Sequence, residues 1–188
     1  MNKDIMVSIA MSTYNHGKFI SQAIDSVLMQ QVNFNYEIVI GDDCSPDNTQ
    51  FIIKEYADKY PDIIKPILRT KNIGALDNTC NIKMNCIGKY FIILEGDDYW
   101  TDPNKLQIQV DFLEAHLEYI GVSHWCDVID EEGEISNDFK NKDDVFNFKK
   151  EVYTLSDFKK NRVPGHTTTL MYKNIYSGSH HDYIKIFE

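Results

Sequence analysis

The sequence predicts an α/β fold, an open and mostly parallel sheet with helices on both faces. The first observation behind this is that apolar segments of strand length alternate four times with amphipathic segments of helical length. The second is that the strand segments are almost continuously apolar, as parallel strands buried on both faces are. The third is composition. The 188 residues are 43% hydrophobic and 26% charged, which is typical of one globular domain, or of one domain with an appendage.

The predicted strands are short apolar runs bounded by turn residues. They are residues 5–11, 36–40, 63–68 and 89–94. Pro66 weakens the third run, because proline has no N–H to donate to a neighbouring strand.

The predicted helices carry apolar side chains at helical spacing. They are residues 17–31, 52–60, 73–87 and 101–117. After residue 119 the alternation ends, and we expect short strands at 120–129 and 170–172. The charged segment between them, residues 131–150, is expected to form turns and a connection.

The composition also excludes several classes of function. A net charge of −10 argues against nucleic acid as the main partner, because phosphate backbones require a basic face. Arg69 and Arg162 are the only arginines, so a phosphorylated ligand would depend on a divalent cation held by carboxylates. The four cysteines have no CxxC spacing, which predicts free thiols rather than a zinc site. No apolar run reaches the length of a membrane span and no secretory signal is seen, so we expect a cytoplasmic protein.

The candidate ligand site lies where the strands end. In open α/β sheets a ligand binds outside the carboxyl ends of the strands. The first strand is followed by residues 12–16 and the second by Asp42 and Asp43. The fourth leads to Asp97 and Asp98, so two acidic pairs meet at one rim. Crowded carboxylates repel one another, and we therefore expect a cation such as Mg²⁺ beside them.

Both acidic pairs have a plainer structural interpretation. Asp97 and Asp98 would also suit a helix cap or a solvated loop, although a second acidic pair on the same rim favours a ligand. Asp42 and Asp43 precede turn and cap residues, so two interpretations stay open for them. In the functional one, one carboxylate accepts hydrogen bonds from a base or ribose while the other secures the loop.

Two ring-bearing residues after the first strand are also ambiguous. Tyr14 has a ring that can stack on a flat ligand, but a tyrosine at a strand end more often packs against the protein. His16 precedes Gly17, and a role at the start of the helix is favoured over a role as a ligand.

Several of these segments together resemble the family 2 glycosyltransferases, which adopt the GT-A fold. The segments are VSIAMSTYN (7–15), IGDDCS (40–45), DNT (47–49), NIG (72–74), GKYF (88–91) and EGDD (95–98). They occur in the family's order, and each lies at or beside the predicted rim. The resemblance covers residues 5–130 well and residues 163–173 more loosely.

The resemblance implies a nucleotide site. Ser12 and Tyr14 would lie against the base, and Asp43 would hydrogen-bond uracil or another base. Asp42 and Lys71 complete the set expected at the nucleotide. Where the family often has an arginine in the helix after the NIG segment, this chain has Thr79, so a phosphate or base contact of that arginine would fall to Lys71 or Arg69, or be absent.

The resemblance also implies a metal and an acceptor site. Asp97 would reach the ribose, and Asp98, with Asp97, would hold the Mg²⁺ or Mn²⁺ that bridges the diphosphate. Glu95 stands where the family often has the first aspartate of its DxD signature. His166 and Thr167 belong to the segment that would face the acceptor, a glycan or a lipid-linked sugar.

The family's catalytic base is a carboxylate downstream of the acceptor segment. Asp182 is the candidate in this chain, although it does not match the motif clearly. We therefore expect residues 1–130 to form a nucleotide-sugar-binding domain and residues 131–188 a partial acceptor region of a truncated chain.

These observations leave three candidate functions to compare. The first is an inverting, metal-dependent glycosyltransferase that uses a UDP-linked sugar in polysaccharide or cell-surface glycan synthesis, in the cytoplasm or at the inner membrane face as a peripheral protein. The alternative is a nucleotide-sugar-binding module without useful transfer, because the base is absent. A phosphoacceptor receiver domain is disfavoured, since its acidic pair would follow the first strand, where this chain has Ser12-Thr13-Tyr14.

Overall fold

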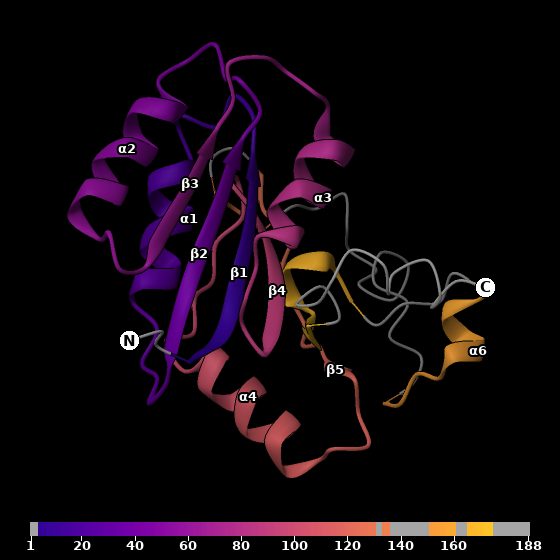
Figure 1. The fold of residues 1–188 in the computed structure, drawn as a ribbon. Coiled ribbons are helices and arrows are strands. Elements are labelled where there is room, and N and C mark those ends of the chain that lie inside the picture. Colours follow the sequence, from indigo (N-terminus) through magenta and orange to yellow (C-terminus); the bar gives the residue numbers. More distant parts are fainter. Residues whose placement is uncertain (1–3, 131–132, 136–150, 161–164, 175–188) are drawn as a thin grey trace.

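The computed structural model describes residues 4–130, 133–135, 151–160 and 165–174. In this part of the chain the sheet has six strands in the order β3-β2-β1-β4-β6-β5 (Figure 1). The strands are β1 (Ile5–Thr13), β2 (Asn35–Asp42), β3 (Ile64–Leu68), β4 (Tyr90–Glu95), β5 (Gly121–Val122) and β6 (Met171–Lys173). The helices are α1 (Ile20–Leu28), α2 (Thr49–Lys59), α3 (Ala75–Met84), α4 (Lys105–Ala115), α6 (Leu155–Phe158) and the 3-10 helix η2 (Thr167–Thr169).

The four strands β1 to β4 form the parallel part of the sheet, as predicted. β1 pairs in parallel with β2 on one side and β4 on the other, and β2 pairs in parallel with β3. β6 then pairs antiparallel with both β4 and β5. A segment from beyond residue 165 thus lies inside the sheet, between two elements that precede it.

Helices cover both faces of this sheet, which confirms the predicted fold class. Val7, Ile9 and Met11 of β1 pack with apolar side chains of α1, α2 and α4 on one face. Ala10 points to the other face, where it packs with Ile82 of α3. Successive side chains of a strand point to opposite faces, so a continuously apolar strand such as β1 requires both layers (Figure 1).

A buried polar cluster joins β1, β2 and the turn into β4. The Ser8 hydroxyl donates to Glu37 Oε1 at 2.6 Å and accepts from the Gly88 N–H at 2.8 Å. The Ile87 N–H donates to the same Glu37 oxygen at 3.0 Å. Ser8 is fully buried and Glu37 is 4% exposed, so water cannot replace these bonds.

Several predicted elements are shorter in the structure than expected, among them the helices predicted over 17–31, 73–87 and 101–117. The first of these, α1, spans Ile20–Leu28. The His16 carbonyl accepts from two N–H groups in the turn before it, and the Gln30 side chain bonds to the Asp102 carbonyl instead of continuing the helix. The strand predicted over 120–129 is limited to Gly121–Val122, because only these residues pair with β6.

No helix in the described ranges is long and apolar enough to cross a membrane.

Candidate functional site

The loop after β4 carries the acidic part of the site. The Gly96 N–H donates to the Ser12 carbonyl at 2.9 Å, which holds this loop beside the end of β1. A Cβ on Gly96 would lie 2.7 Å from Thr13 Oγ1 and 2.9 Å from His16 Nδ1. Only glycine therefore allows the approach that brings Asp97 next to the β1 loop. His16 Nε2 then lies 3.6 Å from Asp97 Oδ2.

The carboxylates of this loop repel one another. Burial, followed by the negative charges of Glu95 and Asp97, raises the pKa of Asp98 to about 6. The nearby His166 and His16 oppose this increase only in part. The acidic loop therefore carries an excess of negative charge.

Asp42 and Asp43 follow β2, and the structure separates their environments. Asp42 is fully buried and accepts from the Ser45 N–H at 2.9 Å, from Gln50 Nε2 at 2.6 Å and from the Ser45 hydroxyl. Its carboxylate thus secures the loop after β2. It does not line the cavity described next.

Asp43 fixes the loop that leads into α3. Its two carboxylate oxygens accept from the N–H groups of Ile73 and Gly74, each at 2.8 Å, while Asn72 Nδ2 donates to the Asp43 carbonyl at 3.0 Å. Gly74 has a φ of 92°, a conformation that glycine adopts without strain. Asp43 thereby connects the end of β2 to the start of α3.

These segments enclose a cavity of about 360 Å³ at the carboxyl ends of β1, β2 and β4. The cavity has polar side chains from β1, the β2 loop, α3 and the acidic loop. It is lined by Ser12, Thr13, Tyr14, His16, Asp43, Asn72, Gly74, Ala75, Asn78, Thr79, Glu95 and Asp97. Four of the residues predicted to bind the nucleotide, Ser12, Tyr14, Asp43 and Asp97, therefore meet in one place. Tyr14 is 48% exposed, so its ring is accessible to a ligand.

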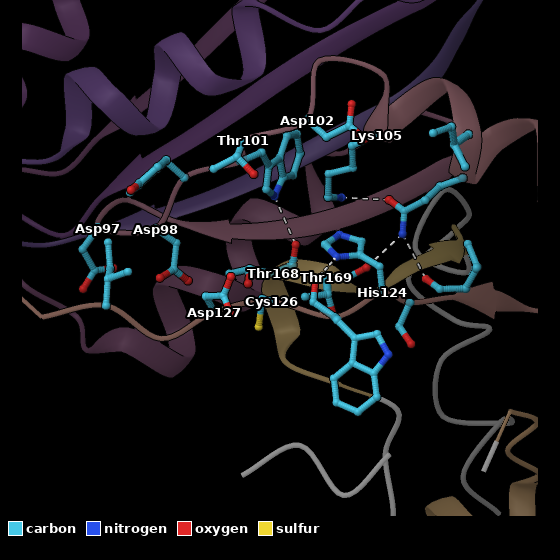
Figure 2. Close-up of a pocket in the computed structure, with 18 of the residues that line it drawn as sticks. Asp97, Asp98, Thr101, Asp102, Lys105, His124, Cys126, Asp127, Thr168 and Thr169 are labelled. Carbon is cyan, nitrogen blue, oxygen red and sulfur yellow. Dashed lines mark hydrogen bonds between the residues drawn. The ribbon is translucent and has the colours of Figure 1, made fainter. Parts of the chain in front are cut away.

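A larger cavity of about 600 Å³ lies between α4, β5 and η2 (Figure 2). Asp97 lines both cavities, and Asp98 lines the larger one. Aromatic side chains of Trp100, Phe112 and Trp125 contribute to its wall. The two cavities thus meet at the acidic loop.

Lys105 lies in the floor of the larger cavity, at the start of α4. It is 6% exposed, its Nζ donates to Gln109 Oε1 at 2.8 Å, and it lies 4.0 Å from the ring centre of Trp100. Burial lowers the pKa of this lysine well below its usual range. Gln109 Nε2 in turn donates to the carbonyls of Val122 and Thr169, which ties α4 to β5 and η2.

His124 lies in the same cavity. Its Nδ1 is 2.6 Å from the Trp125 carbonyl, and because a carbonyl only accepts, this nitrogen carries the proton. Its Nε2 is buried and has no hydrogen-bond partner in the described part of the chain. Burial is the main cause that lowers the pKa of His124.

Other predicted residues lie outside both cavities. Lys71 is exposed, and Arg69 donates to the side chains of Asn78 and Asn81, so neither basic side chain lines the smaller cavity. His166 and Thr167 are exposed at η2, and Thr167 Oγ1 is 3.4 Å from Glu95 Oε1. Asp182, the candidate base, lies outside the described residues.

Sequence reasoning missed several residues of the two cavities. His16 was favoured as a helix-start residue; its carbonyl does start the turn before α1, but its side chain also lines the smaller cavity beside Asp97. Lys105 and His124 carried no signal, since each is a single residue without a motif. Asn78 had a signal, because a polar residue on the buried face of α3 is unusual.

The family model described as glycosyl transferase family 2 matches residues 8–177. The chain belongs to this family. Its sequence is 41% identical over 133 residues to an uncharacterized protein of Mycobacterium tuberculosis, covering 71% of this chain and 38% of that protein. It is 34% identical over 110 residues to the UDP-Glc:alpha-D-GlcNAc-diphosphoundecaprenol beta-1,3-glucosyltransferase WfgD of Escherichia coli, covering 58% of this chain and 42% of WfgD. The matched part is thus less than half of either relative's length.

Solved structures show the same fold at lower identity. TarS of S. aureus, residues 1–349 in complex with UDP-GlcNAc, superposes with a TM-score of 0.67 at 21% identity over 90% of this chain and 46% of that one. The mannosyltransferase PcManGT of Pyrobaculum calidifontis, in complex with GDP-Man and Mn²⁺, superposes with a TM-score of 0.63 at 18% identity over 92% and 45%. The fold of this family 2 member is therefore that of these glycosyltransferases.

Proposed function

We propose that this family 2 glycosyltransferase binds a UDP-linked sugar in the smaller cavity and transfers the sugar, with inversion, to an acceptor hydroxyl. The observation that carries the proposal is the meeting of Ser12, Tyr14, Asp43 and Asp97 in one cavity. The names of WfgD and of the TarS complex, which contain UDP-linked sugars, support the choice of donor.

In this proposal the nucleotide base lies against Tyr14. The exposed ring offers a stacking surface, and Ser12 lies in the same wall. Asp43 accepts a further hydrogen bond from the base, since each carboxylate oxygen has a second lone pair beyond those used for the α3 loop. Because two backbone N–H groups fix the orientation of the Asp43 carboxylate, it favours bases that present an N–H group to its free lone pairs.

Asp97 and Asp98 are the residues that would hold a divalent cation. Among the described residues no group of three or more His, Cys, Asp or Glu side chains forms a metal site. The crowded carboxylates nevertheless fit Mg²⁺ or Mn²⁺, which use one or two protein carboxylates together with the ligand's phosphates. A bound cation would neutralise charge on the leaving diphosphate. The Mn²⁺ in the PcManGT complex supports this choice of cofactor.

The acceptor, a glycan or lipid-linked sugar, approaches from the side of η2. Thr167 lies against Glu95, and His166 is close enough to affect the ionisation of Asp98. A carboxylate takes the proton of the attacking hydroxyl, and Asp182 stays the candidate in this chain. Polysaccharide or cell-surface glycan assembly, at the inner membrane face, is the setting that we propose, and the lipid-linked acceptor in the name of WfgD supports it.

Calorimetry of UDP binding with Mn²⁺, and again with EDTA, tests the cation and the nucleotide together. We expect binding with Mn²⁺, weaker binding with EDTA, and a preference for UDP over ADP that disappears in Asp43→Ala. Asp98→Asn should reduce the Mn²⁺-dependent part of the affinity about tenfold, whereas Asp58→Asn, on the exposed face of α2, makes the same charge change without effect. Equal UDP affinity with Mn²⁺ and EDTA would refute the role of the cation. Equal affinity for UDP and ADP would refute the role of Asp43.

A further inference from the structure

The larger cavity has carboxylates at one end and the nitrogen-bearing side chains of Lys105 and His124 toward the other (Figure 2). Asp97 and Asp98 lie at the end that meets the smaller cavity, while Lys105 and His124 lie toward the other end, where Asp102 also lies. The cavity has a volume of about 600 Å³ and a partly aromatic wall, which suits a sugar ring. A ligand that spans it therefore meets carboxylates with one end and nitrogen-bearing side chains with the other.

Lys105 is a buried amine with no carboxylate partner in the described part of the chain. Within the described ranges no carboxylate forms an ion pair with it, and its Nζ uses one hydrogen bond on Gln109 and the face of Trp100. In its ammonium form the group has three N–H donors, so two would remain for a ligand. Burial disfavours the charged form of this amine, and an anion delivered by a ligand would favour it, so that anion and ammonium group would be stabilised together.

His124 offers the complementary group. Because its Nδ1 donates to the Trp125 carbonyl, its buried Nε2 is an acceptor that receives no hydrogen bond from any described residue. A hydroxyl group is the donor that a sugar would provide. One end of the cavity thus presents a donor for an anion and an acceptor for a hydroxyl, and sugars that carry a carboxylate or phosphate have both groups.

The other acids of the cavity leave this pairing possible. Asp102 is the acidic side chain closest in sequence to Lys105, and its Oδ1 already accepts from the N–H and the side chain of Asn104. Asp127 is drawn in Figure 2 between Asp98 and the histidine, and it is exposed. In the part of the chain that the structure describes, the side-chain amine of Lys105 bonds to Gln109 and to neither of these carboxylates.

We propose that the larger cavity binds the acceptor, and that the acceptor is a sugar with an anionic group that pairs with Lys105. This inference rests on the proposed function, since it places the attacking hydroxyl at the Asp97 end, where the two cavities meet. The anion at the Lys105 end would then fix which hydroxyl of the ring faces the donor. Lys105 is in this respect a specificity-determining residue.

The two tryptophans of the chain make the test direct. Both of them, Trp100 and Trp125, line this cavity, so their indole N–H signals in ¹⁵N NMR report on it alone. The probes are glucuronic acid and glucose 6-phosphate, with glucose as the neutral control. We expect either anionic sugar, or both, to shift the indole signals at a concentration at least about tenfold lower than glucose does. A response to glucuronic acid alone indicates a uronic acid acceptor, and a response to the phosphate alone indicates a phosphosugar.

Lys105→Met, which keeps most of the volume and removes the charge, should abolish the preference for the anionic sugars. Lys54→Met makes the same change on the exposed face of α2 and should keep it. If Lys105→Met does not fold, the unmodified chain decides the question. The deciding quantity is then the concentration of anionic sugar that shifts the indole signals, compared with the concentration of glucose that does so. Equal responses to glucose and both anions, or a preference that persists in Lys105→Met, would overturn the inference.

UDP calorimetry with Mn²⁺ on the same samples separates this inference from the function on which it rests. UDP binding without a preference for anionic sugars refutes the inference alone. The absence of UDP binding refutes the proposed function, whatever the indole signals do.

Discussion

Replacing Asp42 with alanine tests whether this residue holds the β2 loop or contacts the nucleotide. Its carboxylate is fully buried and accepts three hydrogen bonds. Alanine leaves the Ser45 N–H without its acceptor. It also removes one of the two acceptors of Gln50 Nε2, which keeps its bond to the Arg69 carbonyl at 2.9 Å. The change therefore removes support from the loop between β2 and α2.

The size of the effect follows from these bonds. A donor left unsatisfied by removal of its partner costs about 1–3 kcal/mol, and a bond that is lost but replaced elsewhere costs about 1 kcal/mol. The unsatisfied Ser45 N–H, at about 2 kcal/mol, and the two bonds lost from the Ser45 hydroxyl and Gln50, at about 1 kcal/mol each, add to about 4 kcal/mol for Asp42→Ala. In a domain of about 150–250 residues, each kcal/mol lowers the melting temperature by about 2–4 °C. We therefore expect a decrease of about 8–16 °C.

Thermal denaturation followed by circular dichroism measures this decrease, and UDP calorimetry at about 15 °C measures binding while the variant is still folded. Asp42→Asn is the matched control. It keeps one acceptor oxygen for Ser45 and Gln50, and the Ser45 hydroxyl can turn to accept, so less than half of the decrease is expected. UDP affinity should change little in either variant. An unchanged melting temperature together with a tenfold loss of UDP affinity would show that Asp42 contacts the nucleotide.

Three further perturbations have expected outcomes. Burial and the charges of Glu95 and Asp97 raise the pKa of Asp98 from 3.8 to about 6, so the fold loses stability as the pH rises between these two values. Without metal, the melting temperature should therefore rise between pH 7.5 and pH 5 by more in the unmodified chain than in Asp98→Asn. Gly88→Ala places a Cβ 2.6 Å from the backbone N of Ser8 and should cost about 3 kcal/mol, measured by urea denaturation; a change under about 1 kcal/mol would contradict the close approach. Ser8→Ala leaves the buried Gly88 N–H without an acceptor and should cost about 2 kcal/mol in the same assay, and a neutral result would show that water reaches the cluster.

The sequence was sufficient to predict which strands are parallel and which ends of them carry the site. Continuous apolar runs required helices on both faces, and the polar residues after each run then had to meet at one rim. This is why Ser12, Tyr14, Asp43 and Asp97, far apart in the chain, line one cavity.

The two carboxylates after β2 show where sequence reasoning stops. They are chemically identical and adjacent, so the pattern allowed one to secure the loop and the other to face a ligand without deciding which. The decision depends on partners outside the pattern itself, Gln50 in the following helix for Asp42 and the backbone of residues 73–74 before α3 for Asp43. Lys105 could not be predicted for a related reason. A lysine at a helix start is usually solvated, but this one lies against Trp100 and Gln109, and Gln109 in turn bonds to Val122 and Thr169 from later in the chain.

The position of β6 has a consequence for the order in which the molecule forms. The smaller cavity needs no residue beyond Asp97, so it can be complete while the rest of the chain is still being synthesised. Among the described strands β5 pairs with β6 alone, and β6 follows much later in the chain. Until residues 165–174 emerge, β5 lacks this partner and the larger cavity lacks the wall formed by Thr168 and Thr169. The order of the chain therefore allows the smaller cavity to be complete before the larger one exists.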